Sequence, residues 1–139
     1  MCDVMADIDR WLTNGDTVAI ATVIQTWGSA PRRSGAKMAI SAHGKISGSV
    51  SGGCVEGAVA EAAAKVLSSG RAQLLHFGVA DEMAWEVGLA CGGEIDVFVQ
   101  PIRTDTLQTV CAGAELPCAT ITVVRGLESS LGRQMVVHE

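Results

Sequence analysis

The spacing of apolar positions predicts two helices in the first half of the chain. Residues 3–14 and 55–67 each carry apolar side chains at helical spacing. Asn14-Gly15 ends the first segment and Gly70 ends the second, as expected of residues that terminate helices. Two shorter helices are predicted over residues 81–87 and 104–112.

Short runs rich in β-branched residues predict strands between these helices. They cover residues 17–26, 37–41, 45–50, 73–79, 95–101, 119–125 and 134–138. Residues 26–35 contain Pro31 and two glycines, which predicts a loop. We therefore expect an α+β fold: a single domain over residues 1–139, with a mixed or mostly antiparallel sheet and helices packed on it.

One internal similarity stands out among the predicted strands. Ala19–Gln25 matches Ala119–Arg125, and Gly35–Ile40 matches Gly132–Val137. The pattern indicates a strand-loop-strand unit used twice in one sheet. Chance similarity between two strands rich in Val and Thr is the alternative.

Composition excludes several classes of protein. Of the 139 residues 48% are hydrophobic and 18% charged, which excludes a disordered tail. The formal net charge of −5 argues against a general nucleic-acid binder. The sequence has no apolar run approaching the ~20 residues of a membrane span. Its acidic start is unlike a signal peptide, so we expect a cytoplasmic protein.

The five cysteines do not form a recognisable framework. Their number is odd, and no two are spaced as C-x-x-C. In a reducing compartment we expect neither a set of disulfides nor a closed zinc site.

A glycine pair at the start of the second predicted helix is the strongest candidate site. Ser51-Gly52-Gly53 precedes a helix N-terminus, where free amides and the helix dipole attract anions. Cys54 follows, at a position that favours a thiolate, and is therefore a candidate nucleophile. Glu56 is a candidate acid or base, although no paired carboxylate supports that role. The alternative is a tight turn with a buried cysteine.

A second glycine pair and a basic loop complete the candidate residues. Cys91-Gly92-Gly93 reverses the order of the first motif, and the two turns would form one pocket if they met at one end of the sheet. Arg32 follows Pro31 in a restrained loop and is suited to hold a phosphate. Two structural turns and a solvated loop charge are the alternatives. His76 fits a strand residue better than a catalytic base.

Three blocks of sequence make the pattern specific. These are ATVIQTWGSAPRRSGAKMAIS, GSVSGGCVEGAV and FGVADEMAWEVGLACGGEIDVFVQP, within residues 17–101. Together they resemble the N-terminal domain of the XdhC/CoxI family, the accessory factors of xanthine dehydrogenase and carbon monoxide dehydrogenase. The later segment ATITVVRGLESSLGRQMVV also fits the family's continuation.

The resemblance implies a non-catalytic maturation factor, or chaperone. Such a protein binds the molybdenum cofactor (molybdopterin) transiently, supports its sulfuration by a cysteine desulfurase, and helps to insert it into a molybdenum hydroxylase apoenzyme. Cys54 and Cys91 would lie near the molybdenum of the bound cofactor. The cofactor-binding residues implied are Arg32, Ser51, Gly52, Gly53, Cys54, Glu56, Cys91, Gly92 and Gly93.

The resemblance is to one domain only. Longer members of the family continue into a Rossmann-type C-terminal domain, which we expect to be absent here or supplied by a separate partner. A homodimer is expected to cover an exposed sheet edge. Two alternatives remain: a thiol enzyme, for sulfur transfer or redox chemistry, that uses Cys54, and an interaction module without catalysis.

Overall fold

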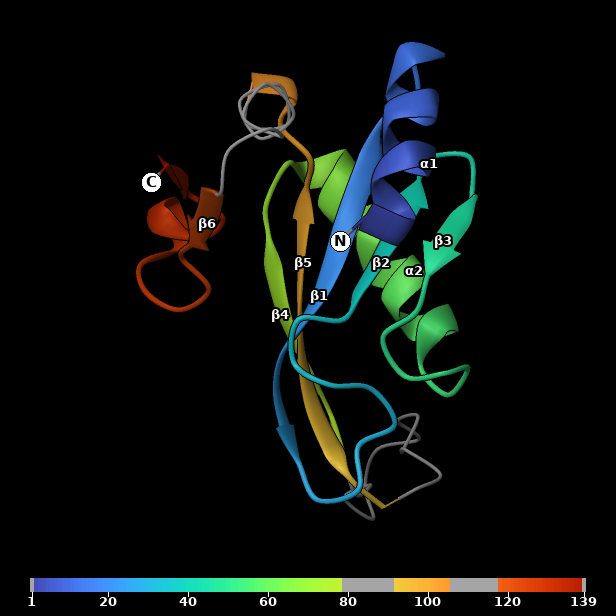
Figure 1. The fold of residues 1–139 in the computed structure, drawn as a ribbon, viewed down its shortest axis with the longest axis vertical. Helices are drawn as coiled ribbons and strands as arrows, with labels where there is room; N and C mark the ends of the chain where they lie inside the picture. Colours follow the sequence, from blue (N-terminus) through green and yellow to red (C-terminus); the bar gives the residue numbers. More distant parts are fainter. Residues whose placement is uncertain (1, 79–91, 106–117, 139) are drawn as a thin grey trace. The chain divides into compact units, whose positions relative to one another are not determined.

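The computed structural model describes residues 2–78, 92–105 and 118–138. The chain forms two compact units, Met1–Pro101 and Ile102–Glu139. In the first, the described elements are α1 (Cys2–Thr13), β1 (Val18–Trp27), β2 (Lys37–Ser41), β3 (Ile46–Gly48), α2 (Glu56–Ser69), β4 (Gln73–Phe77) and β5 (Glu94–Pro101) (Figure 1). In the second they are β6 (Cys118–Thr122), the short 3₁₀ helix η1 (Glu128–Ser130) and β7 (Gln134–His138).

The first unit is built on a five-stranded sheet in the order β3-β2-β1-β5-β4. Every pairing in it is antiparallel. The α+β expectation with a mostly antiparallel sheet is therefore confirmed. Strand β5, which lies between β1 and β4, has buried side chains on both faces along most of its length.

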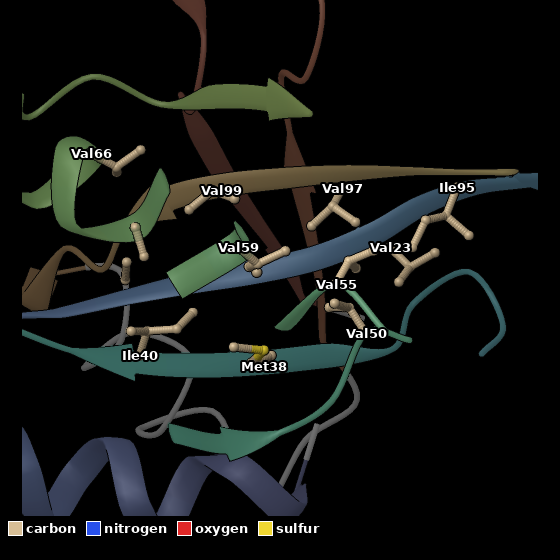
Figure 2. Packing of buried hydrophobic residues seen from close by; sticks show 13 residues of the cluster. Val23, Met38, Ile40, Val50, Val55, Val59, Val66, Ile95, Val97 and Val99 are labelled. Carbon is tan, nitrogen blue, oxygen red and sulfur yellow. The ribbon is translucent and has the colours of Figure 1, made fainter. Parts of the chain in front are cut away.

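The core lies between α2 and one face of this sheet. Val59, Ala63 and Val66 of α2 pack against alanine and valine side chains of β1 and β5. Figure 2 shows this packing, with Val23 and Ile95 near one end of the cluster. Alanine and valine on both sides allow the helix to approach the sheet closely, and this accounts for a core with few aromatic residues.

The other face of the sheet carries α1, packed over β2 and β3. Its apolar stripe of Val4, Ile8 and Trp11 is buried. Ser47 of β3 donates a hydrogen bond to Asp7 of α1. Gly48 has a φ of +77°, and a Cβ there would lie 2.7 Å from Val4 Cγ1. The same Cβ would lie still closer to the backbone oxygen of Lys37 in β2, so this position has to be glycine for β3 to pair with β2 as well as for α1 to pack there.

Most predicted elements are present within a few residues of their expected bounds. The predicted strand over residues 45–50 is shorter, Ile46–Gly48, because the chain turns away at Ser49 toward the start of α2. The predicted helix over residues 81–87, and all but the first two residues of the one over 104–112, lie outside the described residues.

The internal similarity is a structural repeat. Ala21 pairs with Met38 and Ile121 with Met135, so equivalent residues share the same register in β1–β2 and β6–β7. On the opposite face of each pair, Lys37 donates to Thr22 at 2.9 Å and Gln134 donates to Thr122 at 3.2 Å.

The loops of the two copies are also closed in the same way. Equivalent backbone hydrogen bonds are Val23 N–H to Ala36 O and Gly35 N–H to Val23 O in the first copy, and Val123 N–H to Arg133 O and Gly132 N–H to Val123 O in the second. One part of the expectation is wrong: the copies do not share a sheet, because β6 and β7 form a two-stranded sheet of their own.

Candidate functional site

The carboxylate of Glu56, the first residue of α2, organises the predicted anion-binding turn. Its Oε1 accepts hydrogen bonds from the Ser49 hydroxyl at 2.6 Å and the Ser51 amide at 2.9 Å. Its Oε2 accepts from the Ser51 hydroxyl at 2.6 Å and the Gly53 amide at 2.9 Å. The Val50 amide adds a longer contact to Oε1 at 3.3 Å. The Glu56 carboxylate thus accepts hydrogen bonds from four residues of the turn, Ser49, Val50, Ser51 and Gly53.

The two serine hydroxyls extend this network to the remaining amides. Ser49 Oγ accepts from the Gly52 amide at 2.8 Å. Ser51 Oγ accepts from the amides of Cys54 at 3.0 Å and Val55 at 2.9 Å. Each of the six backbone amides from Val50 to Val55 therefore has an acceptor within the chain.

This network corrects the role expected for the Ser51–Gly53 turn. The sequence predicts free amides there for an external anion, but those amides donate to Glu56 and to the serines. The physical reason is that Glu56 is itself an anion placed at a helix N-terminus, where backbone amides and the dipole favour negative charge. Contact between these residues and a cofactor stays a prediction.

The same hydrogen bonds keep Glu56 ionised. Burial raises the pKa of its carboxyl, but hydrogen bonds from Ser49, from the Ser51 hydroxyl and from the Ser51 amide outweigh burial and bring the pKa from 4.5 to about 2. A group with this pKa holds no proton to donate near neutral pH. A role of Glu56 as a general acid is therefore not supported.

Cys54 lies between this turn and the hydrophobic core. It is a free, half-buried cysteine. Its side chain packs against the core cluster that includes Val50 and Val55. Cys91, the second predicted thiol, lies outside the described residues, so the proximity of the two sulfurs stays a prediction.

The loop that carries Arg32 packs against the second glycine pair. A Cβ on Gly93 would lie 2.8 Å from the backbone nitrogen of Ala30 and 3.0 Å from the carbonyl oxygen of Trp27. The backbone of this loop therefore occupies the space that a side chain on Gly93 would need. Arg32 follows this contact and is exposed.

The first predicted turn and Gly93, from the second, lie at the same end of the core (Figure 2). Val55 follows Cys54, Ile95 follows Gly93 by two residues, and both belong to one buried cluster. Figure 2 shows Val50, Val55, Val23 and Ile95 gathered there. The first turn, the Arg32 loop and Gly93 therefore lie at one end of the sheet.

A histidine–aspartate pair beside this end is not indicated by the sequence. His76 Nδ1 of β4 lies 2.6 Å from Oδ1 of the buried Asp96 of β5. The Trp27 ring meets the His76 ring edge-on, with centroids 5.8 Å apart. Because a carboxylate oxygen accepts hydrogen bonds, Nδ1 is the donor when this contact is a hydrogen bond to the Asp96 carboxylate. Only the register between β4 and β5 brings these residues together, and spacing in the sequence does not reveal it.

Two further expectations concern metal sites and membrane spans. In the ranges that the structure describes, no three His, Cys, Asp or Glu side chains gather in a way that could hold a metal ion. Within those same ranges, no helix has the length and apolar character needed to cross a membrane.

Replacing Glu56 by Gln should destabilise the first unit. Gln offers amide hydrogens to groups that are themselves donors, so we expect a loss of about 1–3 kcal/mol in the free energy of unfolding at pH 7. The pKa of Glu56 is lower in the folded chain than in the unfolded chain, so its ionised carboxylate stabilises the folded state fully above pH 4.5. The difference in free energy of unfolding between wild type and Glu56→Gln should therefore shrink as the pH falls toward about 2. Urea unfolding at several pH values measures this.

Glu61→Gln is the matched control, since Glu61 is an exposed carboxylate on the same helix. It should change the free energy of unfolding by no more than about 0.5 kcal/mol at any pH. Equal effects of the two substitutions at pH 7 would contradict the assigned role of Glu56.

Substitutions in the second glycine pair should separate packing from backbone strain. Gly93→Ala places a methyl group against the backbone of residues 29–30 and should displace that loop. Gly92 has a φ of +73° and open space around it, so Gly92→Ala should cost stability without moving the loop. Amide chemical shifts of Ser29 and Ala30 report the difference. Unchanged shifts in the Gly93 variant would contradict the packing described.

Comparison with known proteins identifies the family. The model of the XdhC and CoxI family matches residues 11–78. The Escherichia coli (strain K12) protein named molybdenum cofactor insertion chaperone PaoD is 34% identical over 94 residues, covering 67% of this chain and 29% of that protein. A Bacillus subtilis (strain 168) protein, named as a probable component of xanthine dehydrogenase, is 31% identical over 100 residues, covering 70% of this chain and 30% of that protein.

A solved structure shows the same fold. The crystal structure of a xanthine dehydrogenase from Bacillus halodurans matches with a TM-score of 0.68 and 24% identity, covering 84% of this chain and 36% of that chain. The chain spans less than a third of the length of the Escherichia coli and Bacillus subtilis relatives. The sequence resemblance is confirmed, and through residues 11–78 the chain belongs to the XdhC and CoxI family.

Proposed function

We propose that this chain is the cofactor-binding part of a maturation factor for molybdenum hydroxylases. It would hold the molybdenum cofactor as cargo, transiently and without catalysis, and pass it to the apoenzyme. The observation that carries this proposal is the similarity to a relative named as a molybdenum cofactor insertion chaperone. The second relative, named as a probable part of xanthine dehydrogenase, supports an enzyme of that type as the recipient.

The proposed contacts are made by side chains rather than by the backbone of the first turn. The amides from Val50 to Val55 already donate within the chain, so a phosphate of the cargo would be held by Arg32. Arg32 is exposed and its loop is supported by Gly93, which suits a group that binds an anion from solvent. The turn Ser51-Gly52-Gly53 would be held in place by its hydrogen bonds to Glu56 and would act as a support for these side chains.

The thiols would serve the other end of the cargo. Cys54 and Cys91, with Gly92 and Gly93, would face the molybdenum and its dithiolene sulfurs. Thiolates are suitable neighbours for such a centre because soft sulfur ligands favour softer metals. Cys54 lies at the edge of the core, which supports a role at the rim of a binding surface.

Further partners follow from the same proposal. Sulfuration of the cargo would require a cysteine desulfurase. We also propose that the chain works in the cytoplasm as a homodimer.

Cofactor binding tests the role of Arg32. Purified chain is mixed with molybdenum cofactor released from a molybdoenzyme, and its affinity is measured together with transfer to an apo-hydroxylase. Arg32→Ala should weaken binding by about 1.5–3 kcal/mol, the range of a hydrogen bond to a charged group. Arg32→Lys should recover part of this, because a lysine lacks the two-pronged geometry.

Lys45→Ala provides the matched control, since Lys45 is an exposed cation in the turn between β2 and β3. It should leave cofactor affinity unchanged. Equal losses in both variants would indicate unspecific attraction between charges, and no binding by the wild-type chain would contradict the proposed function. A thiol enzyme would instead lose sulfur transfer in Cys54→Ser while Arg32→Ala retained it.

A further inference from the structure

The structural repeat presents the same apolar face twice. In the first copy this face is formed by Ala19, Ala21, Val23, Met38 and Ile40, all of them at most 2% exposed. Equivalent positions in the second copy, by register and loop hydrogen bonds, are Ala119, Ile121, Val123, Met135 and Val137. Three of the five positions are identical in the two copies: Ala19 and Ala119, Val23 and Val123, and Met38 and Met135. The other two positions are aliphatic in both copies. The two faces therefore suit the same kind of partner.

The two copies differ in what covers this face. In the first copy, Val59, Ala63 and Val66 of α2 pack on it. In the second copy the side chains are exposed: Ile121 53%, Val123 36%, Met135 58% and Val137 43%. Among the described residues of the second unit, the helical ones are Thr104, Asp105 and the three-residue η1; Thr104 and Asp105 are exposed and η1 has no buried residue. An aliphatic face on a two-stranded sheet is not stable by itself in water.

The other face of the same ribbon has a different character. Thr122 accepts a hydrogen bond from the Gln134 side chain across the strand pair. Thr120 lies on that face as well, two residues before Thr122. The ribbon is thus apolar on one side and polar on the other, as is typical of an antiparallel pair with one face packed.

We propose that the apolar face of β6–β7 is a docking surface for an amphipathic α-helix of the α2 kind. Its stripe would be built from valine and alanine at helical spacing, as in α2, where Val59, Ala62, Ala63 and Val66 are buried. The first copy supports this choice of occupant, since it shows what covers a face of nearly the same composition. Ile121 replaces Ala21, so the docking helix needs a small residue opposite it.

A constrained α2 peptide provides the probe. Glu61 and Lys65 are both exposed and four residues apart, so a lactam bridge between their side chains holds a peptide of residues 51–70 helical without touching its apolar stripe. Fluorescence anisotropy then measures binding of the labelled peptide to the full chain. We expect saturable binding that is lost when Val59 and Val66 of the peptide are replaced by Asp.

Substitutions in the chain locate the binding surface. Ile121→Asp should weaken peptide binding by about tenfold or more, because a buried unpaired charge costs well over the ~1.4 kcal/mol that a tenfold change represents. Thr120→Asp, on the polar face, is the matched control and should leave binding within about twofold. Equal binding by both variants, or no binding by the wild-type chain, would overturn the proposal.

The stability of the free chain is the second measurement. If the face is open, Ile121→Asp should leave the thermal unfolding midpoint close to that of Thr120→Asp. A midpoint lowered as far as by a substitution in the buried core would show that the chain covers the face itself, and would also overturn the proposal. Neither experiment involves the molybdenum cofactor, so failure here leaves the proposed function standing.

Discussion

The first unit depends on the hydrogen bonds that the Glu56 carboxylate accepts. Its donors are the hydroxyls of Ser49 and Ser51 and the amides of Ser51 and Gly53. The Ser51 hydroxyl oxygen in turn accepts a hydrogen bond from the Val55 amide, directly before α2. The start of α2 is thereby fixed. Because α2 supplies one whole side of the core, the carboxylate also fixes how β1, β2 and β5 are covered. A surface turn and a buried core are linked through one charged side chain.

This arrangement changes how the Ser-Gly-Gly-Cys motif is understood. Its glycines adopt φ values of +74° and +118°, and in this conformation the Gly52 amide donates to the Ser49 hydroxyl oxygen while the Gly53 amide donates to the Glu56 carboxylate. Recognition of a ligand at this end of the sheet then depends on side chains held by the turn and by the neighbouring loop. Arg32, Cys54 and the loop support from Gly93 are the groups suited to it.

The elements and the fold class can be predicted from the sequence alone. Val4, Ile8 and Trp11 at helical spacing, and β-branched runs closed by glycine or proline, are local signals that the structure follows. The role of Glu56 cannot be predicted in this way, because its donors lie three to seven residues back along a turn whose φ values no spacing rule specifies. The pair His76–Asp96 and the contact of Gly93 with Ala30 depend on strand register and on a loop folding back. The repeat is visible in the sequence, but only the exposure of its side chains shows that the second copy lacks a covering helix among the described residues.

The central claim is that the Glu56 carboxylate is held ionised by the turn it organises. Its carboxyl carbon resonance, followed by NMR in a sample labelled at glutamate, measures this directly. The expected result is a resonance that stays at its ionised position from pH 7 down to about pH 3, with a pKa of about 2. A titration centred near the ordinary value of 4.5, in a chain that remains folded, would contradict the account.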